Sequence, residues 1–446
     1  MFKRKIYNKL LEWKDKYKGS RAVLVEGARR VGKSTIVEEF AKKEYKSYVL
    51  IDFAHTSSNI LRLFEDISKL DLFFLRLQAE LNVQLYNRES VIIFDEVQLF
   101  PKARQAIKYL VKDGRYDYIE TGSLISIKKN VKDILIPSEE IKMQMYPMDY
   151  EEFCDAVGFN YNVINQIYNS KKSIGDSTNR KLIRDFRIYI AVGGMPQAVE
   201  AFVQKKSFNE IDKIKKEIID LYKDDLKKID PSGRLSKIYE SVPAQLASKR
   251  NRFSLKTATK TSKTSKDDER IFDLIDSKMV NVCYLVTEPS LSLNQSVDLT
   301  KYKFYLSDTG LFVTMLFNSD NSNHEDIYKK LLSNKLELNL GYLYENVVSQ
   351  LLVSSGKNLY YYTWDKLEST HKYEIDFLVI NNKKISPFEI KSGKINNHVS
   401  IDNFTRKYST ITGKKYIISS KDIGKEKDIY LLPFYLFEQL IESFKW

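Results

Sequence analysis

Residues 22–35 read AVLVEGARRVGKST, an apolar run that enters a glycine-containing turn and continues into a segment of helical character. The turn fits the pattern G-x-x-x-x-G-K-[ST] at every fixed position, from Gly27 to Ser34. This pattern requires a strand before it and a helix after it, because loop N–H groups and the helix N-terminus must face the same phosphates. Both flanks meet that requirement. The stretch therefore predicts a triphosphate-binding P-loop in an α/β sheet.

The predicted cofactors are ATP and Mg²⁺. Lys33 is expected to reach the β- and γ-phosphates, and the hydroxyl of Ser34 is expected to ligate the Mg²⁺. Arg29 or Arg30 could contact a phosphate as an arginine finger, or both could face solvent, and the sequence leaves this open. The complete set of predicted nucleotide-binding residues is Gly27, Ala28, Arg29, Arg30, Val31, Gly32, Lys33, Ser34 and Thr35.

Two further strand ends supply acids and hydroxyls. Residues 91–94 (VIIF) are typical of a buried parallel strand, and Asp95 and Glu96 follow them directly. Asp95 is predicted to hold the Mg²⁺, and Glu96 to orient and deprotonate the attacking water, which indicates hydrolysis. Thr121 and Ser123 follow the predicted strand 116–120. Their hydroxyls could sense the γ-phosphate, and an ordinary Thr-Gly-Ser turn is an equal alternative.

The rest of the N-terminal part alternates strands with helices up to Pro147, which predicts a parallel α/β sheet. After that point the pattern becomes mostly helical, with a break at Gly193-Gly194, and then short helices followed by a strand give the plan of a winged helix. A last region returns to strands and a helix. The elements predicted here are helices at 1–18, 34–43, 61–86 and 267–278, loops at 169–180 and 318–335, and strands at 21–26, 47–53, 279–286, 359–363, 373–380, 384–391 and 416–419.

A second group of acids lies near the C-terminus. Asp376 and Glu389 fall on neighbouring predicted strands joined by the turn Asn381-Asn382, and Lys391 shares a face with Glu389. Together with Glu345 on a preceding helix, this order of residues resembles the core of PD-(D/E)xK nucleases. The resemblance implies that Asp376 and Glu389 hold Mg²⁺ and that Lys391 positions the nucleophile. A structural module that keeps these residues without turnover is the alternative.

The chain as a whole resembles a family of prokaryotic AAA+-like P-loop ATPases whose C-terminal domain of unknown function has a restriction-endonuclease-like core. The resemblance implies four parts: a P-loop ATPase domain at 1–150, a helical lid at 151–230, a winged helix at 231–320 and a nuclease-like domain at 321–446. The family tends to have a Gly-Arg pair after the Thr-Gly-Ser strand, whereas Lys128-Lys129-Asn130 stands here, so an arginine acting in cis is not identified. The motifs that carry the resemblance are Gly27–Lys33, Asp95–Gln98, Thr121–Ser123, Gly193–Pro196, Phe304–Gly310 and Glu374–Phe377.

Composition excludes several classes of protein. The chain of 446 residues has only 16 Gly and 9 Pro, too few for a disordered or collagen-like chain. Two cysteines and four histidines exclude a disulfide scaffold and a Cys/His zinc cluster, so any metal is expected to have oxygen ligands. No apolar run approaches the ~18–20 residues of a membrane span. A cytoplasmic location without a membrane partner is therefore expected.

The charge points to a polyanionic partner. Lys and Arg number 72 against 59 Asp and Glu, a net charge of +13, which favours nucleic acid or reflects a general bias in composition. Basic residues also gather where a winged helix would contact DNA, although a solvated loop is an equal reading. They are Lys249, Arg250, Arg252, Lys256, Lys260, Lys263 and Lys266.

These observations predict an Mg²⁺-dependent ATPase coupled to nucleic-acid binding or cleavage by its C-terminal domain. The alternative is an NTP-driven signalling switch whose C-terminal domain is a catalytically silent module that binds an unidentified protein partner. A homo-oligomer is a further expectation, since a second copy could supply an arginine in trans.

Overall fold

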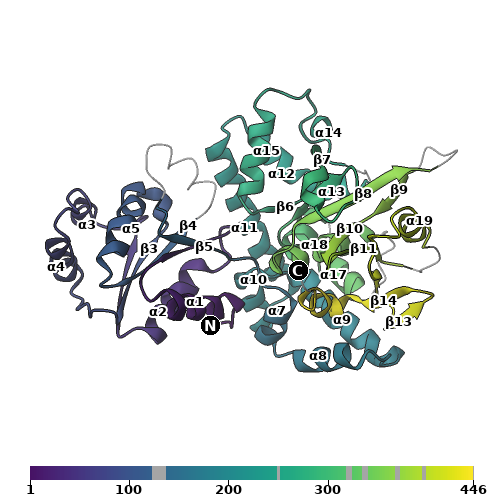
Figure 1. The fold of residues 1–446 in the computed structure, drawn as a ribbon, viewed down its shortest axis with the longest axis horizontal. Helices are drawn as coiled ribbons and strands as arrows, with labels where there is room; N and C mark the ends of the chain where they lie inside the picture. The colour runs from purple at the N-terminus through teal and green to yellow at the C-terminus, as the bar shows by residue number, and fades with distance from the viewer. Residues whose placement is uncertain are drawn as a thin grey trace. The chain divides into compact units, whose positions relative to one another are not determined.

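The computed structural model describes residues 1–122, 137–248, 252–317, 324–333, 340–366, 372–393 and 398–444 (Figure 1). Contacts within the chain define two compact units. The first comprises Met1–Tyr146 with Asp276–Lys278, and the second comprises Pro147–Ile275 with Met279–Trp446. The chain therefore passes from one unit to the other at Pro147, close to the residue where the predicted strand–helix alternation ends.

The first unit is built on a five-stranded sheet in the order β2-β3-β4-β1-β5. Every pair in it is parallel, which confirms the predicted α/β class. The elements are α1 (Lys5–Tyr17), β1 (Ala22–Glu26), α2 (Lys33–Glu44), β2 (Ser47–Asp52), α3 (Ser58–Leu63), α4 (Leu70–Leu81), β3 (Ser90–Asp95), the 3₁₀ turn η1 (Val97–Leu99), α5 (Pro101–Asp113), β4 (Asp117–Gly122) and β5 (Glu140–Gln144).

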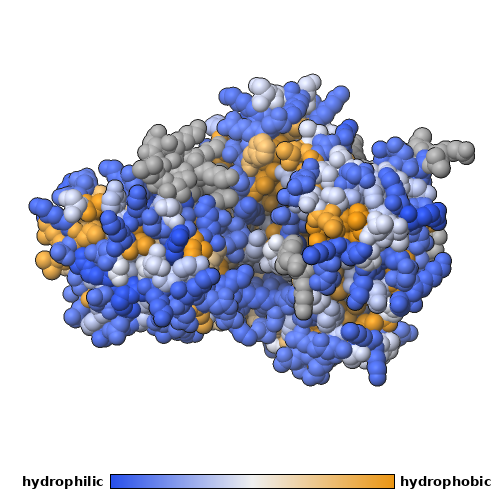
Figure 2. Space-filling model, in the orientation of Figure 1, coloured by the Kyte–Doolittle hydropathy of each residue, from blue (hydrophilic) through white to orange (hydrophobic). Residues whose placement is uncertain are grey.

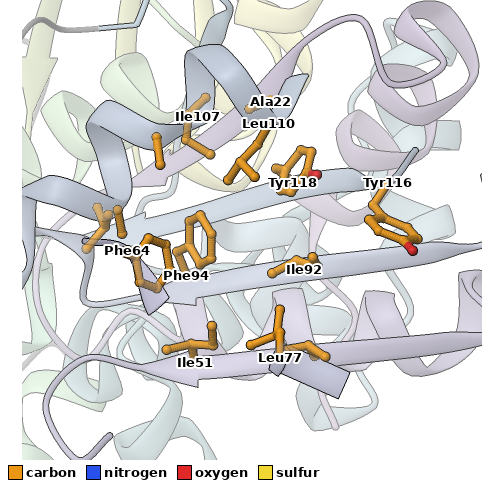
Figure 3. Close-up of a cluster of buried hydrophobic side chains, with 14 of the residues drawn as sticks. Ala22, Ile51, Phe64, Leu77, Ile92, Phe94, Ile107, Leu110, Tyr116 and Tyr118 are labelled. Carbon is orange, nitrogen blue, oxygen red and sulfur yellow. The ribbon is translucent and has the colours of Figure 1, made fainter. Parts of the chain in front are cut away.

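Apolar side chains on one face of this sheet form a continuous core (Figure 3). Ile107 and Leu110 of α5 and Leu77 of α4 pack against the face that carries Ile92 and Phe94 of β3. Each such fully buried side chain contributes about 1.5–3 kcal/mol relative to an exposed one. This core fixes the relative positions of the strand ends that carry the predicted site.

The predicted single helix over 61–86 is wrong. The structure has two helices, α3 and α4, because Asp66 accepts hydrogen bonds from the backbone N (3.1 Å) and hydroxyl of Ser68 and so forms a turn between them. Helix α4 ends at Leu81, where Asn82 adopts a left-handed conformation with φ of 50°. The edge strand β5 was not predicted.

The second unit contains two sheets, in the orders β7-β6-β8-β9 and β10-β11-β12-β14-β13. Its first half is formed by α7 (Tyr150–Val157), α8 (Tyr161–Ser170), α9 (Asp176–Val192), α10 (Pro196–Val203), α11 (Phe208–Ile229), α12 (Arg234–Glu240), α13 (Val242–Ala247), α14 (Leu255–Thr259) and α15 (Asp267–Asp276). Its second half is formed by β6 (Val280–Val286), η2 (Leu293–Ser296), β7 (Val297–Leu306), α16 (Thr309–Leu316), α17 (His324–Leu332), α18 (Gly341–Ser354), β8 (Leu359–Asp365), β9 (Lys372–Ile375), β10 (Phe377–Asn381), β11 (Lys384–Lys391), α19 (Val399–Lys407), β12 (Lys415–Ser419), β13 (Gly424–Glu426), β14 (Ile429–Pro433), η3 (Phe434–Leu436) and α20 (Phe437–Glu442).

Three of the elements predicted for this unit need correction. Helix α9 begins at Asp176, inside the predicted loop 169–180, and α17 occupies most of the described part of the predicted loop 318–335. The predicted strand 373–380 is two strands, because the chain leaves one sheet and enters the other at Asp376. Strand β6 also pairs with β8, so a sheet crosses the predicted boundary at 320. The winged helix and the nuclease-like domain stay predictions.

Two motifs far apart in sequence meet in this unit. One carboxylate oxygen of Asp308 accepts a hydrogen bond from the N–H of Gly194 at 2.6 Å, and the carbonyl of Gly194 accepts one from Met148 at 2.7 Å. A Cβ atom on Gly194 would lie 2.1 Å from the carbonyl oxygen of Met148, and one on Gly310 would lie 2.3 Å from that of Val192. Glycine is required at both positions because backbones approach each other closely there.

The face shown in Figure 2 is mostly hydrophilic, with apolar side chains in small separate groups. Individual exposed apolar residues include Leu75 of α4 and Leu299 of β7, each with 63% of its surface exposed. Across the described segments, no helix combines the length and the apolar character needed to cross a bilayer.

Candidate functional site

The predicted P-loop connects β1 to α2 at the carboxyl edge of the parallel sheet, where ligands bind in such sheets. Lys33 is buried, and its Nζ donates hydrogen bonds to the carbonyl oxygens of Gly27 (3.1 Å) and Ala28 (3.0 Å). Burial lowers the pKa of Lys33, and the negative charges of Glu96 and Asp95 act against that effect. Phosphate oxygens in the loop would give this ammonium stronger acceptors than the two carbonyls.

The remaining predicted loop residues differ in exposure. Ala28 and Val31 are buried, Arg29 is half-buried, and Arg30 and Thr35 are exposed. Gly27 is required, since a Cβ atom there would lie 2.2 Å from the carbonyl oxygen of Met145. Gly32 precedes α2 with a left-handed φ of 98°. The backbone of the loop therefore requires glycine at both glycine positions of the pattern G-x-x-x-x-G-K-[ST].

The structure brings Ser34, Asp95 and Thr121 together. Asp95 accepts hydrogen bonds on the same oxygen, Oδ1, from the hydroxyl of Ser34 at 2.8 Å and from that of Thr121. Strand β4 lies between β1 and β3, so Thr121 stands between the P-loop strand and the acidic strand. Ser123, predicted beside Thr121, lies outside the described residues. The roles of these residues stay predictions, but their proximity is what those roles require.

The donor set at Asp95 fits Mg²⁺. A hydroxyl and a carboxylate are hard oxygen ligands, and Mg²⁺ sites in proteins commonly use one or two such groups together with substrate phosphates. Ser34 and Asp95 would hold the ion, which would supply charge neutralisation for the β- and γ-phosphates. The short distance between their oxygens is compatible with two ligands of one ion.

Glu96 is held by a residue to which sequence reasoning gave no role. Glu96 has a left-handed backbone with φ of 52°, and its N–H donates to Thr121 Oγ1 at 3.3 Å. The amide of the buried Gln98 donates a hydrogen bond to Glu96 Oε2. Gln98 therefore fixes the carboxylate that was predicted to act on the attacking water. The sequence signal for Gln98 is its place at the end of the motif Asp95–Gln98.

A P-loop beside an acidic strand end, with a hydroxyl on the strand between them, defines a P-loop nucleoside-triphosphatase domain. The family comparison agrees, because residues 19–154 match the model of an AAA domain. This segment, most of which lies in the N-terminal unit, is therefore similar to AAA domains. Two other models, each a domain of unknown function, match residues 183–322 and 340–437. A comparison with curated proteins finds no significant match.

Solved structures show distant likenesses. A Walker-type ATPase of Pyrococcus abyssi is 16% identical with a TM-score of 0.43, covering 71% of this chain and 96% of its own. Cdc6p from Pyrobaculum aerophilum is 11% identical with a TM-score of 0.24, covering 74% and 94%. A signal-transduction ATPase with a tetratricopeptide repeat sensor from Pyrococcus horikoshii is 10% identical with a TM-score of 0.27, covering 80% and 49%. The AAA assignment rests on the family model and on the site.

The predicted C-terminal acids also approach each other, within the second unit. Strands β10 and β11 pair with Phe377 opposite Phe388, which places Asp376 and Glu389 next to this pair as the hairpin prediction required. Asp376 Oδ2 accepts a hydrogen bond from the N–H of Ile390 at 2.7 Å. Lys391 Nζ lies 2.8 Å from Glu389 Oε2.

Three further charged residues belong to this cluster. Lys303 of β7 is buried and forms an ion pair with Glu374 of β9, while Glu345 of α18 accepts a hydrogen bond from Tyr305 of β7 at 3.1 Å. Burial, and then the charges of Glu345 and Glu374, raise the pKa of Asp376 well above its usual value. Lys303 was missed by sequence reasoning.

The nuclease resemblance implies Mg²⁺ on Asp376 and Glu389, and among the described residues no third acidic ligand joins them. Among the described acidic and metal-binding side chains, the only three whose ligand atoms all lie within 4.8 Å are Glu151, Glu438 and Glu442. Glu345, Asp376 and Glu389 therefore do not converge as three ligands of one ion. Each of them accepts a hydrogen bond from a donor of the protein itself. We derive no metal-dependent step from them.

Proposed function

We propose that the N-terminal unit binds ATP with Mg²⁺ and hydrolyses it. The observation that carries the proposal is the hydrogen-bonded group of Ser34, Asp95 and Thr121 beside the buried Lys33. A P-loop that only held phosphate would not need an acid, a hydroxyl and a second acid at the ends of two neighbouring strands.

The chemistry assigned to each residue follows from its position. Lys33 would pair with the β- and γ-phosphates, and Thr121 would contact the γ-phosphate or the attacking water from the central strand. Glu96 would accept the proton of that water, and Gln98 would keep the carboxylate of Glu96 oriented toward it. An arginine that stabilises the transition state is not assigned in cis, so a second copy of the chain remains its proposed source.

An ATPase assay on the full chain tests the proposal. Lys33→Ala is expected to lose both nucleotide binding and hydrolysis, whereas Glu96→Gln is expected to keep binding and to lower kcat about 10²–10⁴-fold. Lys43→Ala is the matched control, since this lysine lies on the same helix with 61% of its side chain exposed. Protein that does not bind ATP–Mg²⁺ at millimolar concentration, or Glu96→Gln with unchanged kcat, would contradict the proposal.

We further propose that the second unit contacts nucleic acid through an exposed basic segment around α14. The described members Arg252, Lys256, Lys260, Lys263 and Lys266 are all exposed. Only Lys263 among them has an acidic partner at ion-pair distance, Asp268 at 2.7 Å. Exposed cations without a nearby acid are the groups that neutralise phosphates most readily.

Binding of a fluorescent DNA duplex at several salt concentrations tests this second proposal. The combined change Lys256→Ala and Lys260→Ala is expected to reduce the slope of log K against log salt by about 2, one for each phosphate contact. Lys227→Ala with Lys228→Ala is the control, because these exposed lysines pair with Asp224 and Asp225. DNA that neither binds nor changes the ATPase rate would favour the signalling switch with a protein partner.

A further inference from the structure

We propose that Arg4 is a positioning residue for the nucleotide, which holds one peptide of the P-loop in the orientation that phosphate binding requires. The peptide is the one between Val31 and Gly32. Through a second hydrogen bond, Arg4 joins this peptide to Tyr146, after which the chain leaves the first unit. The inference rests on the proposed binding of ATP by the first unit, and it adds a residue that lies outside the P-loop pattern.

The guanidinium of Arg4 is buried and donates to two main-chain carbonyl groups that are far apart in the sequence. Its Nη1 donates to the carbonyl of Val31 at 2.9 Å, and its Nη2 donates to that of Tyr146 at 2.6 Å. Only 6% of Arg4 is exposed. A buried cation is costly unless its donors are used, and the planar fork of arginine can reach two acceptors at once. Arg4 therefore connects the loop to a second segment of the same unit.

The hydrogen bond to Val31 fixes the direction of the N–H group of Gly32. The C=O and N–H groups of a trans peptide point in opposite directions, so a Val31 carbonyl that faces Arg4 directs the Gly32 N–H away from Arg4. In a P-loop, main-chain N–H groups must face the phosphates. Gly32 has a φ of 98°, and a glycine at this place allows the preceding peptide to turn over at little cost. Arg4 holds that peptide in one orientation.

Arg4 is itself positioned by the helix that follows it. Its carbonyl accepts a hydrogen bond from the N–H of Tyr7 at 3.0 Å, at the start of α1. Helix α1 packs against α2, where the ring centroids of Tyr7 and Phe40 lie 5.3 Å apart (Figure 1). Helix α2 begins at Lys33, directly after the loop. The loop and the residue that holds it thus share one support.

The second acceptor of Arg4 belongs to a segment that contacts the start of the loop. The N–H of Met145 donates to the carbonyl of Glu26 at 2.8 Å, and a Cβ atom on Gly27 would lie 2.2 Å from the carbonyl oxygen of Met145. Arg4 adds a contact between the other end of the loop and Tyr146. A nucleotide that orders the loop is therefore expected to order residues 145–146 as well.

Titration of the full chain tests the proposal, with ATP–Mg²⁺ and inorganic tripolyphosphate as the two probes. Arg4→Met removes both donors and is expected to raise the Kd of both probes about ten- to a hundredfold, the factor for a loop that is correctly oriented about 1–10% of the time. The KM for ATP is expected to rise by the same factor with little change in kcat, because Glu96 and Thr121 are untouched. Tripolyphosphate has no base or sugar, so an equal loss for both probes locates the effect at the phosphates.

Lys14→Met is the matched control, because Lys14 is also a cation of α1 that donates to a main-chain carbonyl. Its acceptor is the carbonyl of Glu44, at the end of α2 away from the loop. This variant is expected to bind both probes like the wild type. A folded Arg4→Met that binds tripolyphosphate as tightly as the wild type would overturn the inference alone. Wild-type protein that binds neither probe would contradict the proposed function and this inference with it.

If Arg4→Met does not fold, hydrogen exchange of the wild-type protein provides the test. ATP–Mg²⁺ is expected to slow exchange in the loop and also at the N–H groups of Met145 and Tyr146, to which Arg4 joins it. Protection of the loop without protection of these two N–H groups would overturn the inference.

Discussion

Replacing Glu120 by glutamine is expected to stabilise the N-terminal unit. Glu120 lies on β4 and is completely buried, with its carboxyl group beside that of Glu140. Glu140 of β5 acts on it as a neighbouring negative charge, and is itself held by two hydrogen bonds from Arg104, at 3.1 and 2.9 Å. Burial first, and then Glu140, raise the pKa of Glu120 well above its usual value.

The expected effect has a definite sign with pH. The folded protein binds the Glu120 proton more tightly than the unfolded chain, so this residue lowers stability progressively as pH rises above the unfolded pKa of about 4.3. Each unit by which the pKa is raised corresponds to about 1.4 kcal/mol at pH values above the folded pKa. Glutamine has almost the same shape and no charge. We expect Glu120→Gln to stabilise the unit by about 1–3 kcal/mol at pH 8, and by less near pH 5.

Urea unfolding at pH 5, 6, 7 and 8 measures this difference. Trp13 lies in the first unit and is buried, so its fluorescence reports on that unit once Trp364 and Trp446 are replaced by phenylalanine. Glu140→Gln is the control, and is expected to lose about 3–5 kcal/mol because it leaves Arg104 buried without its partner. A Glu120→Gln variant that is less stable at pH 8, or whose difference from the parent does not change with pH, would refute the reasoning.

Two further predictions follow from single contacts. Gln98→Leu removes the donor to Glu96, so steady-state assays are expected to show kcat lowered about ten- to a hundredfold with little change in KM; an unchanged kcat would mean that the contact does not orient the carboxylate. Gly194→Ala places a Cβ atom 2.1 Å from the carbonyl oxygen of Met148, so urea unfolding is expected to show a loss of about 3 kcal/mol or more. Gly393→Ala, where a Cβ atom meets nothing within 4 Å, is expected to be nearly neutral, and equal effects of the two changes would contradict the clash.

Much of the N-terminal site could be predicted from the sequence because its signals are local. The P-loop, the strand before it and the helix after it occupy one continuous stretch, and the acid pair directly follows a strand that is apolar throughout. Strand β5 gave no such signal, because Glu140–Gln144 is only partly buried and contains charged residues. The hydrogen bond from Gln98 to Glu96 was also not predictable, since it depends on the left-handed turn at Glu96.

The C-terminal cluster shows which contacts the local sequence pattern predicts and which it does not. Asp376 and Glu389 were placed together because a short hairpin fixes their register. Lys303 could not be added to them, since Lys301 and Lys303 are two lysines close together in the sequence and no local pattern distinguishes them. Their exposed side-chain fractions are 42% and 7%. Lys303 is paired with Glu374 of β9, whereas Lys301 is paired with Asp298 of its own strand. The sequence therefore predicts that Asp376 and Glu389 lie together, whereas only the packed structure shows that Lys303 pairs with Glu374.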